Sequence, residues 1–185
     1  MSKIKGSLTL KQFADINQMS VENMRALIKN HEMLLPFDSF KREFAYGDAL
    51  AIEVARQLAD KDGVPLAEAV RLTSYTSAVD HYMARPYNGT GATDFWLAVT
   101  GSRNTWGDLP RGSWPVTGFG PKEYWAELHF TGSLGEITGE IATWIGRDQV
   151  QHPDSDPARI IFANVSAADR RLRKRAADLG INFGD

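Results

Sequence analysis

The sequence predicts an α+β protein in two parts, a mainly helical N-terminal part over residues 1–85 and a smaller mixed α/β part over residues 93–185. Three observations support this fold class. Apolar residues recur at helical spacing through most of the first part. The stretch RPYNGTGAT, from Arg85 to Thr93, breaks that spacing with proline, asparagine and glycine. Beyond it, short apolar runs typical of buried strands alternate with helical patterns.

Two short amphipathic helices are predicted between residues 8 and 30, with a tight turn between them. Thr9 and Gln12 have the spacing of a capping box at the start of the first helix, and Ser20 is placed to cap the second. The side chains expected to face the core are Phe13, Ala14, Ile16, Met19, Val21, Met24, Leu27 and Ile28. The small Ala14 lets the helices cross closely, so the pattern predicts a helix-turn-helix.

A short β-hairpin, or wing, is expected after the second helix. Its strands are predicted over residues 34–37 and 40–46, with turn chemistry at Asp38-Ser39 between them. Three helices are then expected, over residues 47–62, 65–72 and 73–84. The last of these would either join the two parts or pair two protomers.

Helix, turn, helix, wing and two further helices, in this order, resemble the DNA-binding domain of MerR-like transcription regulators. The residues that carry the resemblance are LTLKQFADINQMSVENMRALIKN, LLPF, REFAYGDALAIEVARQL and DGVPLAEAVRL, within about residues 6–74. The chain departs from the family at Arg25-Ala26-Leu27, where relatives usually carry two adjacent aromatic residues after the arginine. Winged-helix excisionases and phage packaging subunits fit this part equally well. The resemblance implies a dimeric, sequence-specific regulator that binds double-stranded DNA.

If the resemblance holds, the free face of the second helix enters a DNA major groove. Asn23 is placed to read an adenine edge, and Arg25 to read guanine or bind phosphate. Phosphate contacts are expected from Lys29 and from the wing. The predicted DNA-binding residues are Ser20, Glu22, Asn23, Arg25, Ala26, Lys29, Asn30, Lys41 and Arg42. For each of them, a solvated surface position is the alternative interpretation.

Charge does not favour general attraction to nucleic acid. Basic and acidic side chains through residue 75 number ten each, and the whole chain has a formal net charge of −2. A protein that relied on non-specific attraction to phosphates would be more basic. DNA binding by this chain must therefore use a local patch, doubled by dimerisation, or be weak.

The second part is predicted to contain strands over residues 94–100, 160–165 and, unless it forms a helical turn, 123–130. A stretch rich in glycine and proline, over residues 101–121, is expected to be mainly loop. Trp106 and Trp114 lie in this loop, where they are candidates to cover a ligand or anchor a partner. Filling of the core is the alternative role for the tryptophans of this part.

Two helices are predicted in the second part. Ser133 and Glu136 have capping-box spacing at the start of residues 133–145, for which a strand pair is the alternative. Ser166 is expected to cap a final helix that stops at Gly180.

The final helix carries the one strongly basic run of the sequence. Its cations are Arg170, Arg171, Arg173, Lys174 and Arg175. A solvated face, a second phosphate contact and docking onto an acidic partner are the three interpretations of this run. Together with Trp106 and Trp114, it predicts a domain that senses a small-molecule or protein effector, dimerises or recruits a partner.

No cofactor, metal or catalytic site is predicted. The chain has no cysteine, its four histidines lack metal-ligand spacing, and dinucleotide loops, Walker loops and nucleophile elbows are missing from the sequence. Apolar runs do not reach membrane-spanning length, and the MSKIKGS start does not resemble a signal peptide, so we expect a cytoplasmic protein of bacterial or phage type. We expect a transcription regulator; a protein-interaction module and a small enzyme at the tryptophan-lined loop are the alternatives.

Overall fold

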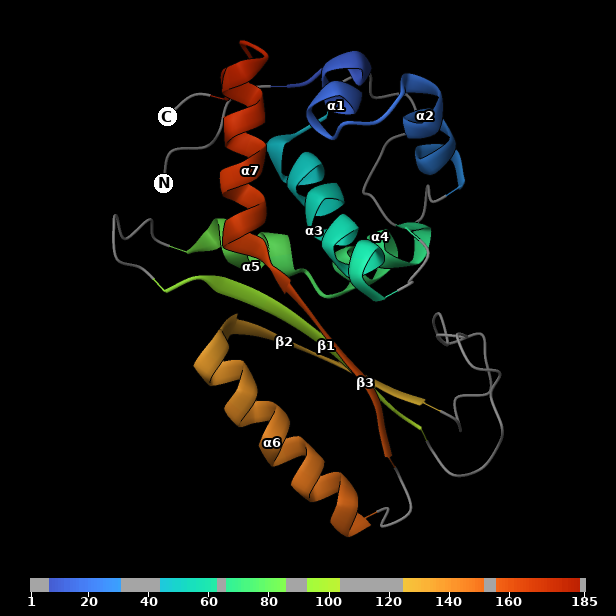
Figure 1. Ribbon diagram of the computed structural model, residues 1–185, viewed down its shortest axis with the longest axis vertical. Coiled ribbons are helices and arrows are strands. Elements are labelled where there is room, and N and C mark those ends of the chain that lie inside the picture. Colours follow the sequence, from blue (N-terminus) through green and yellow to red (C-terminus); the bar gives the residue numbers. More distant parts are fainter. Residues whose placement is uncertain are drawn as a thin grey trace.

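The computed structural model describes residues 7–30, 44–62, 66–85, 93–103, 125–151 and 156–183, and these form an α+β fold (Figure 1). The helices in these ranges are α1 (Leu10–Ile16), α2 (Val21–Asn30), α3 (Tyr46–Asp62), α4 (Leu66–Tyr75), α5 (Ala78–Ala84), α6 (Leu134–Gln151) and α7 (Val165–Asp178). The strands are β1 (Phe95–Arg103), β2 (Trp125–Ser133) and β3 (Asp156–Asn164). The predicted fold class is therefore confirmed at the level of α+β.

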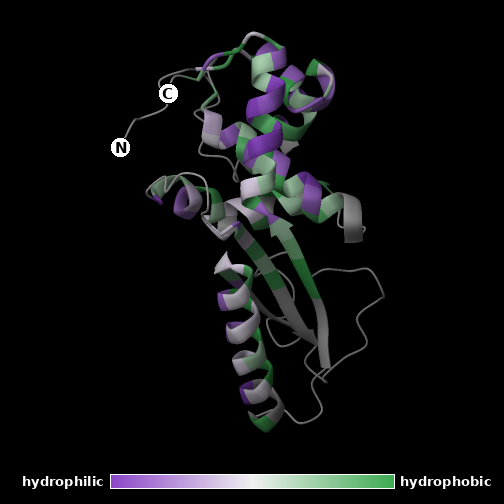
Figure 2. Cartoon of the chain, turned by 60° about the vertical axis from the view of Figure 1, so that its left-hand side comes forward, coloured by the Kyte–Doolittle hydropathy of each residue, from purple (hydrophilic) through white to green (hydrophobic). Residues whose placement is uncertain are grey.

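The three strands form one antiparallel sheet in the order β2-β1-β3. Helix α6 connects the two outer strands across one face of the sheet (Figure 1). Ala98 of β1 lies on that face, in a small buried cluster with Ile137 and Ile141 of α6. Figure 2 shows α6 with its hydrophobic side towards the strands. Because side chains alternate along a strand, Leu97 and Val99 of β1 point to the opposite face.

The opposite face of the sheet joins a larger core that both halves of the chain build. This cluster contains Phe13 of α1, Leu50 of α3, Leu97 of β1 and Leu172 of α7, all of them inaccessible to solvent. Helix α7 lies beside α3 and α1 (Figure 1). Residues from both sides of the expected boundary near residues 85–93 therefore share this larger core, because the last helix packs with the first ones.

The structure alters the predicted entry to the long helix. Tyr46, expected at the end of a wing strand, is the first residue of α3. Asp48 Oδ2 accepts a hydrogen bond from the backbone N–H of Ala45 at 2.7 Å, and this contact favours a helix start at that point. Phe44 forms an isolated antiparallel bridge with Leu8. The rest of the predicted wing, residues 34–43, lies outside the described residues, so the winged arrangement stays a prediction.

The predicted helix over residues 73–84 is interrupted. Helix α4 continues to Tyr75, Ser77 takes a left-handed φ of +50°, and α5 begins at Ala78. Hydroxyl side chains around the break bond to backbone carbonyls: Thr73 Oγ1 donates to Ala69 O at 2.8 Å, and Thr76 Oγ1 donates to Thr73 O at 3.0 Å. Such side chains compete with the regular helix pattern and help to end it.

The prediction that Ser166 caps the final helix was wrong. Asn164 is the N-cap of α7, where its Oδ1 accepts from the backbone N–H of Ala167 at 2.7 Å. Ser166 Oγ instead accepts from the backbone N–H of Phe95 at 2.9 Å and so joins α7 to β1. The predicted stop at Gly180 is confirmed by its φ of +66°.

Two other predictions for the second part are decided by the structure. The ambiguous segment 123–130 corresponds to strand β2, which begins at Trp125. The segment predicted over residues 133–145 is helical from Leu134 onward, as the capping pattern predicts. At its start the backbone N–H of Ser133 donates to Glu136 Oε2 at 2.8 Å, and the N–H of Glu136 donates to Ser133 Oγ at 3.3 Å.

Candidate nucleic-acid interface

Both caps predicted for the α1–α2 pair are present. The backbone N–H of Gln12 donates to Thr9 Oγ1 at 3.3 Å, and the N–H of Thr9 donates to Gln12 Oε1 at 2.9 Å, which completes the capping box of α1. At the start of α2, Ser20 Oγ accepts from the N–H of Asn23 at 3.1 Å. These bonds satisfy N–H groups that the first helical turns leave without a partner, so local sequence fixes where each helix begins.

The turn between α1 and α2 is closed without glycine. Gln18 adopts a left-handed φ of +53°. The backbone N–H of Met19 then reaches back to Ala14 O at 2.9 Å. Asn17, fully buried at the end of α1, donates from Nδ2 to Phe13 O at 3.0 Å. The result is a short connection that brings the two helices against each other.

The inner face of the pair is fixed in the large core, as the sequence predicts. Phe13, Ala14, Ile16 and Met24 have no exposed surface, and Leu27 is also buried. The predicted residues Met19, Val21 and Ile28 are partly buried against the same cluster. These contacts determine which side of α2 can face outward.

The opposite side of α2 faces solvent. All the predicted DNA-binding residues whose side chains are described are exposed: Ser20, Glu22, Asn23, Arg25, Ala26 and Lys29. Ser20 also caps the helix with its hydroxyl group. The side chain of Asn30 and the residues Lys41 and Arg42 lie outside the described part of the chain. The structure therefore leaves six of the nine predicted residues exposed on α2 or just before it.

The charges exposed on α1 and α2 are mixed. Lys11, Arg25 and Lys29 supply positive charge, while Asp15 and Glu22 supply negative charge. Glu22 lies in the first turn of α2, where the helix dipole favours a carboxylate. With three cations and two carboxylates, this exposed surface is close to neutral, like the N-terminal part as a whole.

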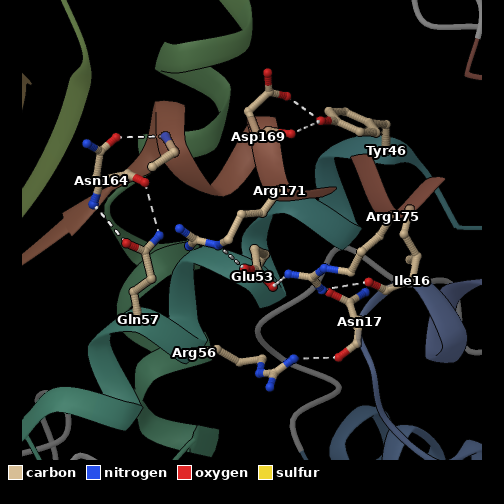
Figure 3. A network of polar contacts seen from close by, with 11 residues as sticks. Ile16, Asn17, Tyr46, Glu53, Arg56, Gln57, Asn164, Asp169, Arg171 and Arg175 are labelled. Atoms are coloured by element: carbon tan, nitrogen blue, oxygen red, sulfur yellow. Dashed lines mark hydrogen bonds and ion pairs between the residues drawn. The ribbon is translucent and has the colours of Figure 1, made fainter. Parts of the chain in front are cut away.

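The carbonyl end of α1, next to α2, is held by two arginines from distant parts of the chain (Figure 3). Arg56 Nη1 of α3 donates to Asn17 O at 2.7 Å, and Arg175 Nη1 of α7 donates to Ile16 O at 2.8 Å. Arg175 also forms an ion pair with the buried carboxylate of Glu53 at 2.7 Å. The helical pair is thus attached to both α3 and α7.

The basic run of α7 is bound mostly to carboxylates of the same chain. Its ion pairs are Arg170–Asp94 at 2.7 Å, Arg171–Glu53 at 2.9 Å, Arg173–Asp169 at 3.0 Å and Arg175–Glu53 at 2.7 Å. Lys174 is exposed. Only 17% of the Arg175 side chain is accessible, so this residue is not placed to bind a phosphate or an external partner. The other predicted partner candidates, Trp106 and Trp114, lie outside the described residues.

Asp169 organises a second polar cluster between α3, α5 and α7. The hydroxyl of Tyr46 donates to Asp169 Oδ1, and that of Tyr82 donates to Oδ2 at 3.1 Å. Arg173 Nε donates to the same carboxylate at 3.0 Å. Burial, together with the adjacent carboxylate, raises the pKa of Tyr82 to about 12 and that of Tyr46 further. Both phenols therefore stay protonated and act as donors that join the three helices.

The sequence did not predict the residues of α3 and α7 that attach the helical pair to the core. Glu53 stands between two core positions of α3, Ile52 and Val54, and a carboxylate at such a position is a signal for a buried partner. Its partners Arg171 and Arg175 lie more than 100 residues further along the chain. Their identity could not be read from the sequence.

Comparison of the chain with protein-family models, curated proteins and solved structures gives no match. The resemblance to MerR-like regulators therefore remains a prediction that depends on the residues quoted above. Within the ranges that the structure covers, His, Asp and Glu side chains do not gather in groups of three suited to a metal ion. Among those same ranges, every helix is too short or too polar to cross a membrane.

Proposed function

We propose that α1 and α2 form a helix-turn-helix that binds double-stranded DNA, with α2 in the major groove, and that the protein is a sequence-specific transcription regulator of MerR-like type. The observation that supports this most is the division of α2 into two faces. Its apolar side is buried in the core, whereas the polar side from Ser20 to Lys29 is exposed. A helix fixed in this way can present side chains to base edges without disturbing the fold.

The proposed roles follow from residue chemistry. Asn23 and Arg25, close to the N-terminal end of α2, are the candidates for base contacts, because amide and guanidinium groups can bond two atoms of one base. Lys29 is the candidate for a phosphate contact, which positions the protein without reading sequence. Because the N-terminal part has no net charge, we propose that two copies bind together and double the contacts.

Selection of genomic DNA fragments by the full-length protein at physiological salt tests this function. The expected result is enrichment of a defined sequence with two related half-sites. Arg25→Ala should weaken binding to the selected duplex about 10- to 100-fold for each copy bound, the range for loss of one specific base contact. Arg147→Ala is the matched control, because Arg147 is an exposed arginine on α6, across the sheet from the helical pair. Absence of any enriched sequence would contradict the proposal.

The acidic residues on the exposed face favour a second candidate, a protein-interaction module. Asp15 and Glu22 would repel phosphates but could pair with cations of a partner protein. In that case binding of DNA fragments would be absent or independent of sequence. The selection experiment distinguishes the two functions directly.

A further inference from the structure

The turn that leads into α2 is fixed from outside the helical pair. The last carbonyl groups of a helix have no partner within it. At the end of α1, Ile16 O accepts from Arg175 of α7 and Asn17 O accepts from Arg56 of α3 (Figure 3). Arg175 is 159 residues away from Ile16 in sequence, so this contact connects the two ends of the described chain.

Arg175 is itself held in place by Glu53. One nitrogen of its guanidinium lies 2.7 Å from Glu53 Oε2, and another donates to Ile16 O at 2.8 Å. The planar guanidinium carries several N–H groups in a fixed arrangement, so it can bond two partners at once. Arg171, one turn earlier on α7, donates from Nε to the other oxygen of Glu53 at 2.9 Å. Of these two arginines, Arg175 is the one that bridges α1, α3 and α7.

Helix α3 is also joined to α7 and to the residue before it at two further positions along α3. Gln57 Nε2 donates to Asn164 O at 3.0 Å, and Gln57 Oε1 accepts from the backbone N–H of Asn164 at 3.2 Å. Asn164 is both the last residue of β3 and the cap of α7. At the other end of α3, Tyr46 binds Asp169. The position of β3 and α7 is therefore coupled to α3 along most of its length.

We propose that Arg175 is a positioning residue for the DNA-binding helix. Its contact with Ile16 couples the turn before α2 to α7. Because α7 follows β3 directly, the position of β3 is coupled to that turn as well. This inference rests on the proposed function and adds a means of control to it. A part of the protein that does not touch DNA determines how well α2 fits the groove.

The test compares two alanine variants of the full-length protein on the duplex selected from genomic fragments. Arg175→Ala should weaken binding about tenfold or more, while the dependence of affinity on salt concentration keeps the wild-type slope, because a phosphate contact has not been removed. Arg171→Ala is the matched control: it loses a bond to the same Glu53 but leaves the contact with Ile16 intact. It should bind DNA within about twofold of the wild type.

Hydrogen exchange provides a readout that is independent of DNA. The amides of residues 17–24 should exchange faster in Arg175→Ala than in Arg171→Ala, whereas exchange in β1 should be similar in the two variants. If Arg175→Ala does not fold, Arg175→Lys replaces it, and an intermediate affinity is expected, because one ammonium group cannot reproduce the planar double contact.

Several outcomes would overturn the inference. Wild-type affinity in Arg175→Ala would show that the contact does not position α2. A lower salt slope in that variant would mean that Arg175 binds phosphate directly. Equal losses in both arginine variants would assign the effect to general stability. If the wild-type protein binds no duplex, the proposed function fails, and the exchange measurement alone decides whether Arg175 positions α2.

Discussion

Helices α2 and α7 both carry arginine and lysine on an amphipathic helix, yet the structure uses these cations differently. On α2, Arg25 and Lys29 are exposed on the side away from the core. On α7, Arg171 and Arg175 bind Glu53 of α3, and other arginines of the run bind Asp94 and Asp169. The more basic helix is therefore the one engaged in holding the fold together. Most of the positive charge on α7 is thus paired with carboxylates of the same chain.

The largest effect is expected from the apolar side of α7. Leu172 is fully buried in the core that joins both halves of the chain. Leu172→Ala should lower the free energy of unfolding by about 2–5 kcal/mol, because it removes buried methyl groups and leaves a cavity. Denaturant unfolding followed by circular dichroism would measure this loss. If α7 were an independent surface element, the loss would be well below this range.

A smaller loss is expected when the common partner of two arginines is changed. Glu53→Gln keeps the shape of the side chain but removes the charge that faces Arg171 and Arg175. We expect the free energy of unfolding to fall by about 1–3 kcal/mol, below the value for a fully buried pair, because Arg171 is partly exposed. Thermal unfolding would measure this loss. The control is Glu140→Gln, because Glu140 is an exposed glutamate on α6. Equal stability of the two variants would contradict the role assigned to Glu53.

The smallest effect concerns the exposed end of the α7 run. Hydrogen bonds from Arg170 and Asn164 lower the pKa of Asp94 from its ordinary value of 3.8 to about 2. The stabilisation by Asp94 is therefore complete above pH 4 and is lost as the pH falls from about 4 towards 2. Because the Arg170 side chain is largely exposed, we expect the pair to contribute less than about 1 kcal/mol to the free energy of unfolding. Asp94→Asn should flatten the dependence of the unfolding free energy on pH over this interval, and an unchanged dependence would contradict the assignment.

Local signals in the sequence predicted much of the helical pair. Thr9, Gln12 and Ser20 define the two helix starts by capping, and helical spacing of apolar residues correctly separated the buried from the exposed side of α2. The cap of α7 was missed because Asn164 and Ser166 both offer suitable side chains. The choice between them depends on where β3 ends, which is a tertiary property.

Long-range pairing could not be predicted in the same way. The boundary near residue 85 follows from composition, but α7 returns to pack on α1 and α3, so both halves contribute to the larger core. The ion pairs of Arg171 and Arg175 with Glu53 bring together residues more than 100 positions apart. Nothing in the sequence around the basic run indicates these partners. The sequence therefore predicted cations that face solvent or an external ligand.

The central claim is that the exposed side of α2 binds DNA. The most direct test is the salt dependence of DNA binding by the Lys29→Ala variant. The affinity of wild-type protein and variant for the selected duplex would be measured over a series of salt concentrations. If Lys29 contacts a phosphate, the slope of log affinity against log salt should fall in magnitude by about 0.9 for each copy bound. An unchanged slope and affinity in Lys29→Ala, or wild-type binding that does not respond to salt, would contradict the claim.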